Sequence, residues 1–266
     1  LGHESYGMLC ALNELGVDEK YLRKEQIEGI EELPDDATIG NEDVLSYLGL
    51  DDTILDLKLL ANRSDCNGLF NVAREIAALF KRKLTLPIYE ETANYNETNF
   101  KVDSLTTNCD AFTLRIFKDV KVKESPKWLK EVLRSEGIRS INNIVDIGNY
   151  VMLLTGQPVH MYDLSKIDSN SFVVKDDYCG KFLALDDKEY DLISNDLVVT
   201  SDNIPVAIGG IMGLKNVEVT TDSKNIALEV ASFNGTKVRK TSSRLGLSSD
   251  SSSRFVKGIN KDNLLE

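Results

Sequence analysis

The chain has 266 residues, of which 42% are hydrophobic and 28% are charged. These proportions are ordinary for a soluble globular protein, and no apolar run approaches the roughly 18 residues of a membrane span. The formal net charge of −12 excludes a protein that coats nucleic acid through many phosphate contacts, so any nucleic-acid contact must be local.

The length predicts about two domains, each large enough to bury its own core. The four cysteines are far apart in the sequence, at Cys10, Cys66, Cys109 and Cys179. They form no CxxC pair, and no histidine is spaced to complete a zinc site with them. We therefore expect free thiols in a reducing cytoplasm.

The N-terminal third mixes turn formers with two short periodic segments. The chain starts without an initiator methionine, and we expect a fragment of a longer protein that opens with the tail of a domain. Residues 18–50 are acidic and rich in turn formers, which predicts a connection along the surface. Ile54 to Leu59 alternates as ILDLKL, which predicts a half-buried strand.

A helix is predicted from about Asp65, after the turn NRSDC. Its expected inward face is apolar and consists of Leu69, Val72, Ile76, Leu79 and Phe80. The polar stretch from Pro87 to Phe100 lacks any apolar period and predicts a linker.

The next elements are a strand and a well-delimited helix. Ala111 to Val122 predicts the strand. The helix has Ser125 as the expected N-cap, Pro126 in its first turn and Gly137 after its end. Its expected inward residues are Trp128, Leu129, Val132 and Leu133.

The stretch from Asn142 to Leu164 predicts a buried helix followed by a fixed bend. Asn142 is the expected N-cap, and Gly156 stops the helix. The apolar residues with helical spacing are Ile144, Val145, Ile147, Val151, Met152 and Leu154. Gly156, Gln157 and Pro158 form a turn, because proline fixes one backbone angle and lacks an N–H donor.

His160 follows that bend and is one of only two histidines in the chain. An imidazole with a pKa of about 6.5 exchanges a proton near neutral pH, which suits a general base or an anchor for a reacting water. The alternative is a structural histidine that packs under the turn and bonds a backbone carbonyl.

Three later segments predict strands, Phe172 to Lys175, Leu197 to Thr200 and Asn225 to Val230. Helices and strands in mixed order predict an α+β fold. The segment VAIGGIMGL, Val206 to Leu214, lacks the order of a phosphate loop, so it is either a close approach to a ligand or a tight bend in a sheet.

Glu229 interrupts the strand-like run IALEVASF. Strand alternation places Ala227, Glu229 and Ala231 on one face, lined by small residues as a pocket is. The alternatives are a partnered glutamate and one that faces water. A local basic run follows, with Lys237, Arg239, Lys240, Arg244, Arg254 and Lys257 against the single acid Asp250. It is either a phosphate-binding patch or a solvated helix face.

In combination, these motifs resemble the β subunit of bacterial phenylalanyl-tRNA synthetase along nearly the whole chain. SYGMLCALNELG is similar to the end of its tRNA-binding OB-fold module, and DLKLLANRSDCNGLFNVAREIAALF to the small module that follows. GIRSINNIVDIGNYVMLLTGQPVHMYDL, AIGGIMG, ALEVASF and RLGLSSDSSSRF follow the order of the B3/B4 domain. The implied modules are 1–48 (OB-fold remnant and connection), 49–90 (small B1-like α/β module) and 91–266 (B3/B4-type α+β domain).

The resemblance implies an editing activity, in which the B3/B4 domain hydrolyses tyrosine wrongly esterified to tRNA(Phe) with a positioned water. The implied catalytic residues are His160, Asn149 and Arg139. The implied substrate-binding residues are Glu229, Gly213, Ser249, Ser251 and Gly148. Glu229 is suited to accept the tyrosine hydroxyl, since a pocket that bonds this hydroxyl rejects phenylalanine by leaving polar groups unpaired.

Further expectations follow from the same resemblance. The implied tRNA-binding residues are Lys237, Arg239, Lys240 and Arg244. The implied partners are the α subunit, in an α2β2 cytoplasmic enzyme, and tRNA(Phe). No metal or cofactor is implied for these residues, although ATP and magnesium are implied for the whole synthetase.

The chain departs from the family pattern at a few positions. Gly148 replaces a common threonine, serines stand at Ser249 and Ser251 where threonine and alanine are frequent, and Val256 replaces a glutamate. The alternative function is therefore a non-catalytic tRNA-binding and scaffold module of the same synthetase with a weakened editing site.

Overall fold

The computed structural model describes residues 2, 4, 6–22, 24–87, 89, 97–261 and 264. It divides into two units, the first comprising Leu1–Leu57 and Ser125–Ile141 and the second Lys58–Glu124 and Asn142–Glu266. This division by contacts differs from the predicted modules, because residues 125–141 group with the N-terminal residues rather than with 91–266.

The first unit is helical and has a small core. Its elements are η1 (Glu19–Tyr21), α1 (Lys24–Glu28), α2 (Val44–Tyr47) and α4 (Lys127–Ser135). Leu12, Val17 and Leu22 form the core, and Leu133 of α4 is fully buried. The guanidinium of Arg134 donates to the carbonyls of Leu48 and Gly49, which satisfies two backbone acceptors near the end of α2.

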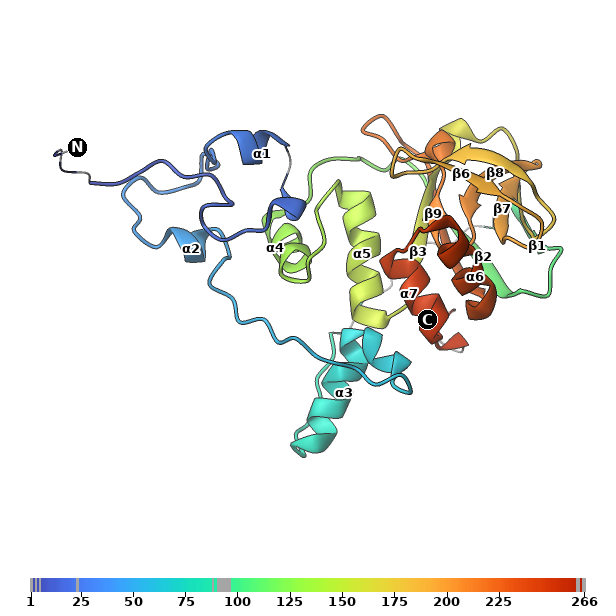
Figure 1. Cartoon of the computed structure of the whole chain (residues 1–266), viewed down its shortest axis with the longest axis horizontal. Helices are drawn as coiled ribbons and strands as arrows, with labels where there is room; N and C mark the ends of the chain where they lie inside the picture. The colour runs from blue at the N-terminus through green and yellow to red at the C-terminus, as the bar shows by residue number, and fades with distance from the viewer. Residues whose placement is uncertain are drawn as a thin grey trace. The chain divides into compact units, whose positions relative to one another are not determined.

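The second unit is built on three sheets (Figure 1). The five-stranded sheet has the order β1 (Lys101–Ser104), β4 (Ser171–Lys175), β7 (Val198–Ser201), β8 (Ile204–Ile208) and β9 (Met212–Gly213). The antiparallel three-stranded sheet has the order β2 (Cys109–Phe117), β10 (Ile226–Phe233) and β3 (Val159–Asp163). β5 (Gly180–Leu183) and β6 (Glu189–Leu192) form a hairpin. Only the β1–β4 pair among the described strands is parallel.

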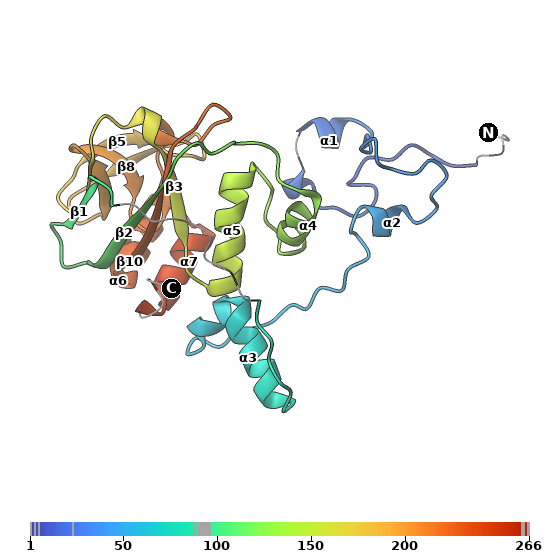
Figure 2. The ribbon, with the colours of Figure 1, turned by 180° about the vertical axis from the view of Figure 1, so that it is seen from behind.

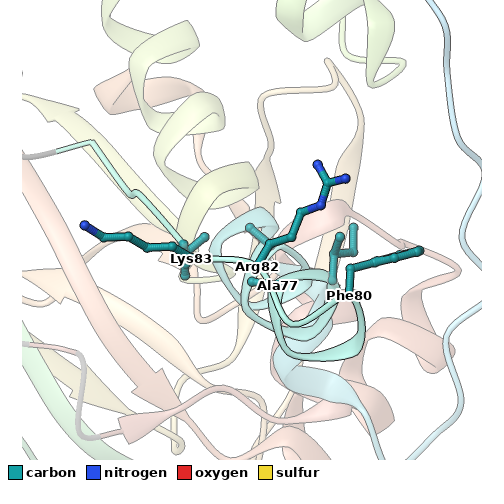
Figure 3. A pocket seen from close by; sticks show the side chains of 7 residues that line it. Ala77, Phe80, Arg82 and Lys83 are labelled. Atoms are coloured by element: carbon teal, nitrogen blue, oxygen red, sulfur yellow. The ribbon is translucent and has the colours of Figure 1, made fainter.

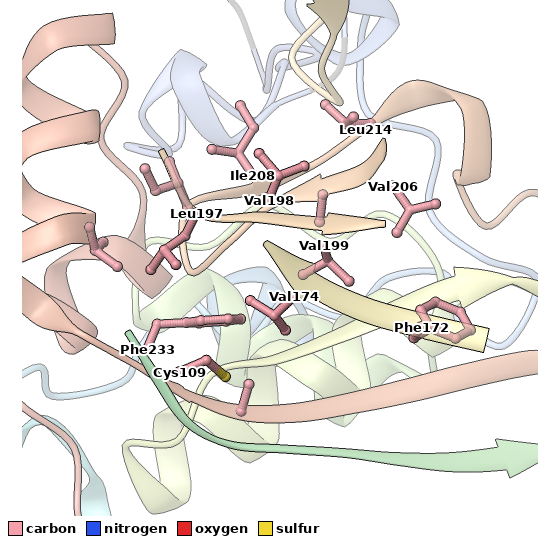
Figure 4. Packing of buried hydrophobic residues seen from close by; sticks show 14 of the residues in the cluster. Cys109, Phe172, Val174, Leu197, Val198, Val199, Val206, Ile208, Leu214 and Phe233 are labelled. Carbon is pink, nitrogen blue, oxygen red and sulfur yellow. The ribbon is translucent and has the colours of Figure 1, made fainter. Parts of the chain in front are cut away.

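The core of this unit lies where the two larger sheets meet. Figure 4 shows buried side chains from β2, β4, β7, β8 and β10 packed between and around these strands. All four residues of β7 are buried, so this central strand is covered on both faces. Burial of this apolar surface is the main favourable term in folding the unit.

Helices flank the three-stranded sheet. α5 (Asn143–Thr155) runs beside β3 in both views, and α6 (Gly235–Leu245) and α7 (Asp250–Lys257) pack on each other beyond β10 (Figures 1 and 2). α3 (Leu69–Leu79) follows η2 (Ser64–Asn67) and meets the end of α5. A Cβ at Gly68 would lie 2.5 Å from the Thr155 carbonyl carbon, so this close approach requires glycine. Two short 3-10 turns, η3 (Leu164–Lys166) and η4 (Lys215–Val217), complete the unit.

Several predictions from the sequence are confirmed. The fold is α+β, and the three late strands form as β4, β7 and β10. The side chain of Asn142 caps α5 by accepting from the N–H groups of Ile144 and Val145, and Gly156 ends the helix with φ at 80°. The Val206–Leu214 segment is a tight bend between β8 and β9. The four cysteines are free thiols.

The expected strand at Ile54–Leu59 is wrong. These residues are irregular and exposed, with Leu55 at 73% exposure, and no described strand pairs with them. A strand needs a neighbour for its backbone hydrogen bonds, which alternation alone does not provide. The expected inward face of the next helix is wrong in the same way, because Leu79 and Phe80 are 76% and 65% exposed, and the helix begins at Leu69 after a 3-10 turn.

Other details also differ from prediction. Pro126 rather than Ser125 is the N-cap of α4, Trp128 is 52% exposed, and β2 ends at Phe117. On α5, Ile147 is exposed, because the buried face follows Ile144, Gly148 and Met152. The predicted linker Pro87–Phe100 includes residues 88 and 90–96, which lie outside the described residues.

Candidate functional site

The centre of the candidate site is a cross-strand pair. His160 on β3 lies directly opposite Glu229 on β10 in the antiparallel register. The turn after α5 fixes this register, since the Gln157 side-chain amide donates to the carbonyl of its neighbour Pro158 at 2.9 Å and to that of Ala231 on β10 at 3.0 Å. Directly opposed residues project from the same face of a sheet, so the imidazole and the carboxyl share one environment.

Tyr162 joins this pair from the same face of β3. Its hydroxyl donates a hydrogen bond to Glu229 Oε2, and its side chain is fully buried. The His160 ring meets the Tyr162 ring edge to face, with centroids 4.7 Å apart. The ring centroids of Phe172 on β4 and Tyr162 are 5.2 Å apart, so the tyrosine is held between two aromatic rings.

Burial perturbs the titration of all three groups. Desolvation raises the pKa of Glu229 to about 7, although the hydrogen bond from Tyr162 lowers it. Desolvation lowers the pKa of His160 to about 4, so the imidazole is neutral at pH 7. Burial and then the charge of Glu229 raise the pKa of Tyr162, which keeps its hydroxyl protonated as a donor. The site therefore presents a neutral imidazole beside a carboxyl that is part ionised at neutral pH.

Polar atoms of this pair remain available to a ligand. Glu229 is 7% exposed and its Oε1 accepts no hydrogen bond from the described residues. No side-chain hydrogen bond joins the His160 nitrogens to another described residue either. The alternative of a solvent-facing Glu229 is wrong, because the side chain is buried and accepts a hydrogen bond from Tyr162. The His160 ring packs on Tyr162, and the choice between a catalytic and a structural role for it stays a prediction.

Gly213 lies against the His160 ring. A Cβ at this position would lie 2.4 Å from both Cε1 and Nε2 of the imidazole, which no side chain tolerates without a shift. The predicted proximity of Gly213, His160 and Glu229 is thus present in the fold. The β8–β9 bend carries Gly213 and is tied to α7, because Ser249 Oγ donates to the Ile211 carbonyl at 2.7 Å and Ser251 Oγ to the Gly210 carbonyl at 3.3 Å.

Gly148 and Asn149 lie on α5, behind β3. A Cβ at Gly148 would meet Met161 Cε at 2.9 Å and Val159 Cγ2 at 3.2 Å. Met161 and Val159 alternate with His160 along β3, so they face the opposite side of the sheet. Asn149 is half-buried, and its side chain forms no hydrogen bond with the described residues. Their roles at the substrate stay predictions.

Arg139 belongs to the first unit, where it is exposed, whereas the other predicted site residues belong to the second. Its catalytic role also stays a prediction.

The predicted tRNA-binding residues all lie on α6 but differ in their contacts. Arg244 pairs with the buried Asp196 and donates to the Asp191 carbonyl at 2.9 Å. Lys237 Nζ donates to Asn195 Oδ1 at 3.1 Å. Arg239 and Lys240 are exposed and have no charged partner among the described residues. The predicted patch therefore contains one cation paired with a buried carboxylate, one with a surface hydrogen bond and two without a charged partner among the described residues.

Sequence reasoning missed Tyr162, although a signal was available. Tyr162 follows His160 by two positions, and residues two apart on a strand share a face. The sequence prediction treated the segment after Pro158 as a bend that presents one histidine, so it did not apply this period.

No cluster of metal-ligating side chains occurs in the described ranges. An open pocket of about 480 Å³ is lined by Ala77 of α3 and by Phe80, Arg82 and Lys83, which follow the end of this helix (Figure 3). It shares no residue with the His160–Glu229 pair. Among the described helices, none has the length and hydropathy that a bilayer span requires.

The family model for the B3/4 domain matches residues 108–266, which include His160, Gly213 and Glu229. The chain belongs to the B3/4 domain family. The resemblance drawn from the sequence motifs is confirmed by curated relatives that match along the whole chain. The phenylalanine–tRNA ligase β subunit of Streptococcus thermophilus is 42% identical over 272 residues, and that of Lactococcus lactis is 39% identical over 272 residues, each with 100% of this chain covered.

The chain spans about a third of the length of these relatives, 33% and 34% respectively. Among solved structures, it is similar to an N-terminal fragment of the phenylalanyl-tRNA synthetase β subunit from Pyrococcus horikoshii, with 17% identity and a TM-score of 0.40. That match covers 78% of this chain and 68% of the other.

Proposed function

We propose that this B3/4 domain is the editing part of a phenylalanyl-tRNA synthetase β subunit and hydrolyses tyrosine wrongly esterified to tRNA(Phe). The observation that carries the proposal is the direct pairing of His160 with Glu229, whose second carboxyl oxygen is open. The relatives, which are phenylalanine–tRNA ligase β subunits, support the assignment to the synthetase. The whole enzyme would then be a cytoplasmic α2β2 ligase that uses ATP and magnesium elsewhere.

Glu229 would select the substrate. In its ionised form, Glu229 would accept a hydrogen bond at Oε1 from the phenol hydroxyl of tyrosine, while Oε2 keeps its bond from Tyr162. Phenylalanine lacks that donor and leaves a buried carboxylate short of a partner, which costs on the order of 1 to 3 kcal/mol or more. Gly213 lets the His160 ring lie against β9 beside the substrate position, because a Cβ at Gly213 would lie 2.4 Å from two ring atoms.

His160 would position the attacking water. With a pKa of about 4 the imidazole is a weak proton acceptor, so we assign it to orienting water through an accepted hydrogen bond rather than to carrying the proton. Water attacks the ester carbonyl, the ester C–O bond breaks, and one water proton ends on the released ribose oxygen. No covalent enzyme intermediate is required.

The test is deacylation of purified Tyr-tRNA(Phe) by the full αβ enzyme carrying this β sequence. His160→Ala and Glu229→Ala are compared with Glu189→Ala, an exposed strand glutamate on β6 that serves as the control. We expect deacylation by the wild type and the control, and a loss in the other two. If wild type, His160→Ala and Glu229→Ala all deacylate at the uncatalysed rate, the chain is instead a tRNA-binding scaffold module.

A further inference from the structure

We propose that Tyr162 is a positioning residue for substrate selection, whose hydroxyl holds one oxygen of Glu229 so that the other oxygen meets the substrate's phenol group. This inference rests on the proposed function, and it assigns a role to a residue outside the predicted site. It concerns which oxygen of Glu229 is free and how firmly the carboxyl is held.

The geometry supports a fixed donor. Tyr162 is fully buried, and its ring centroid lies 4.7 Å from that of His160 and 5.2 Å from that of Phe172. The two neighbouring rings therefore prevent the phenol from rotating away from Glu229. Its backbone partner across the sheet is Ala227, two residues before Glu229, which places the hydroxyl diagonally beside the carboxyl. A rigid donor of this kind lowers the entropy lost when a ligand binds the other oxygen.

The environment explains why such a donor is needed. Glu229 lies on a face lined by Ala227 and Ala231, neither of which can donate a side-chain hydrogen bond. The facing groups are the His160 ring, the Tyr162 hydroxyl and the Cys109 thiol, whose pKa is raised to about 12 by burial and then by Glu229. No cation in the described part of the chain pairs with Glu229. Tyr162 is thus the strong donor that favours the ionised carboxyl in this apolar setting.

The central experiment compares Tyr162→Phe with the wild type in the full αβ enzyme. The variant keeps the ring and removes only the hydroxyl. Tyr190→Phe is the matched control, because the Tyr190 hydroxyl also donates to a carboxylate, Asp186 at 2.6 Å, but on the β5–β6 hairpin. Steady-state deacylation of Tyr-tRNA(Phe) and Phe-tRNA(Phe) is measured from pH 5.5 to 8, with the uncatalysed rate subtracted.

Tyr162→Phe is expected to differ from the wild type in three ways, and Tyr190→Phe is expected to behave as the wild type. The KM for Tyr-tRNA(Phe) rises more than kcat falls, since ground-state positioning is lost. The preference for the tyrosyl over the phenylalanyl ester falls by roughly ten- to hundredfold, the value of a hydrogen bond to a charged group. The acidic limb of the kcat/KM profile moves to higher pH, because Glu229 becomes harder to ionise. An unchanged ester preference together with an unchanged pH profile would overturn the inference.

A second readout separates this inference from the proposed function. The infrared band of the protonated Glu229 carboxyl, identified by its loss in Glu229→Gln, is titrated in the wild type and in Tyr162→Phe without any tRNA. An inactive wild type would refute the proposed function, and a titration midpoint that does not move would refute the role of Tyr162. If Tyr162→Phe does not fold, 3-fluorotyrosine at position 162 replaces it. This stronger donor must move the midpoint to lower pH, and an unmoved midpoint contradicts the inference.

Discussion

His160 and Glu229 lie directly opposite each other on the antiparallel strands β3 and β10, although 69 positions separate them in the sequence. The pair joins a neutral imidazole to a buried carboxyl with one open oxygen. Their shared face also holds Tyr162 and borders Gly213.

Gly213→Ala is predicted to disable the site through His160. The new Cβ would lie 2.4 Å from two ring atoms, so the imidazole must move away from Glu229. We expect a loss of about 1 to 3 kcal/mol in the free energy of unfolding from overpacking. Deacylation of Tyr-tRNA(Phe) should fall on the order of a hundredfold, since small misplacements of a catalytic group have this effect.

Gly148→Ala provides the contrast. Its Cβ would meet the flexible end of Met161 at 2.9 Å and a methyl group of Val159 at 3.2 Å, so only small shifts are needed. Alanine also favours a helix interior by up to about 1 kcal/mol over glycine. Denaturant unfolding should therefore give a free energy equal to or above that of the wild type. If both alanine variants lose stability equally, the close packing of Gly213 on His160 is not the cause.

Glu229→Gln is predicted to remove a pH dependence of stability. The folded-state pKa of Glu229 is raised from 4.5 to about 7, so the folded protein holds this proton more tightly than the unfolded chain. The wild type therefore loses stability relative to the variant as pH rises from about 4.5 to about 7, by an amount on the order of 3 kcal/mol. Urea titrations at several pH values measure this difference. A difference that is flat over this interval would show that Glu229 titrates normally.

The two open cations of α6 are predicted to contact tRNA. In the double variant Arg239→Gln with Lys240→Gln, tRNA(Phe) affinity should fall, and the slope of log K against log salt should drop by about 0.7 to 0.9 per lost phosphate contact. The fold should be unaffected, because both side chains are exposed and have no charged partner among the described residues.

Arg244→Gln should behave in the opposite way. It leaves the buried carboxylate of Asp196 without its cation, so unfolding free energy should fall by about 1 to 3 kcal/mol. Its salt slope should stay close to that of the wild type. If the double variant keeps both the stability and the salt slope of the wild type, α6 is a solvated face and not a tRNA contact.

Local signals in the sequence were enough for the elements that carry the site. The caps of α5 at Asn142 and Gly156 depend on neighbouring residues, and the alternation around Glu229 depends only on the strand period. The strand predicted for Ile54–Leu59 was wrong because strand formation depends on a partner strand. The burial predicted for Phe80 was wrong because an apolar stripe on a helix does not specify which part of the protein covers it. The hydrogen bond of Tyr162 to Glu229 depends on the register of two distant strands, which no local pattern specifies.

The most direct test of the account is the ratio of kcat/KM for Tyr-tRNA(Phe) to that for Phe-tRNA(Phe), measured for the full αβ enzyme with wild-type β and with Glu229→Ala. The account predicts a high ratio for the wild type and a ratio that approaches one for the variant, because the acceptor of the tyrosine hydroxyl is removed. A wild-type ratio near one, or a high ratio that Glu229→Ala leaves intact, would contradict the assignment of Glu229 as the group that recognises tyrosine.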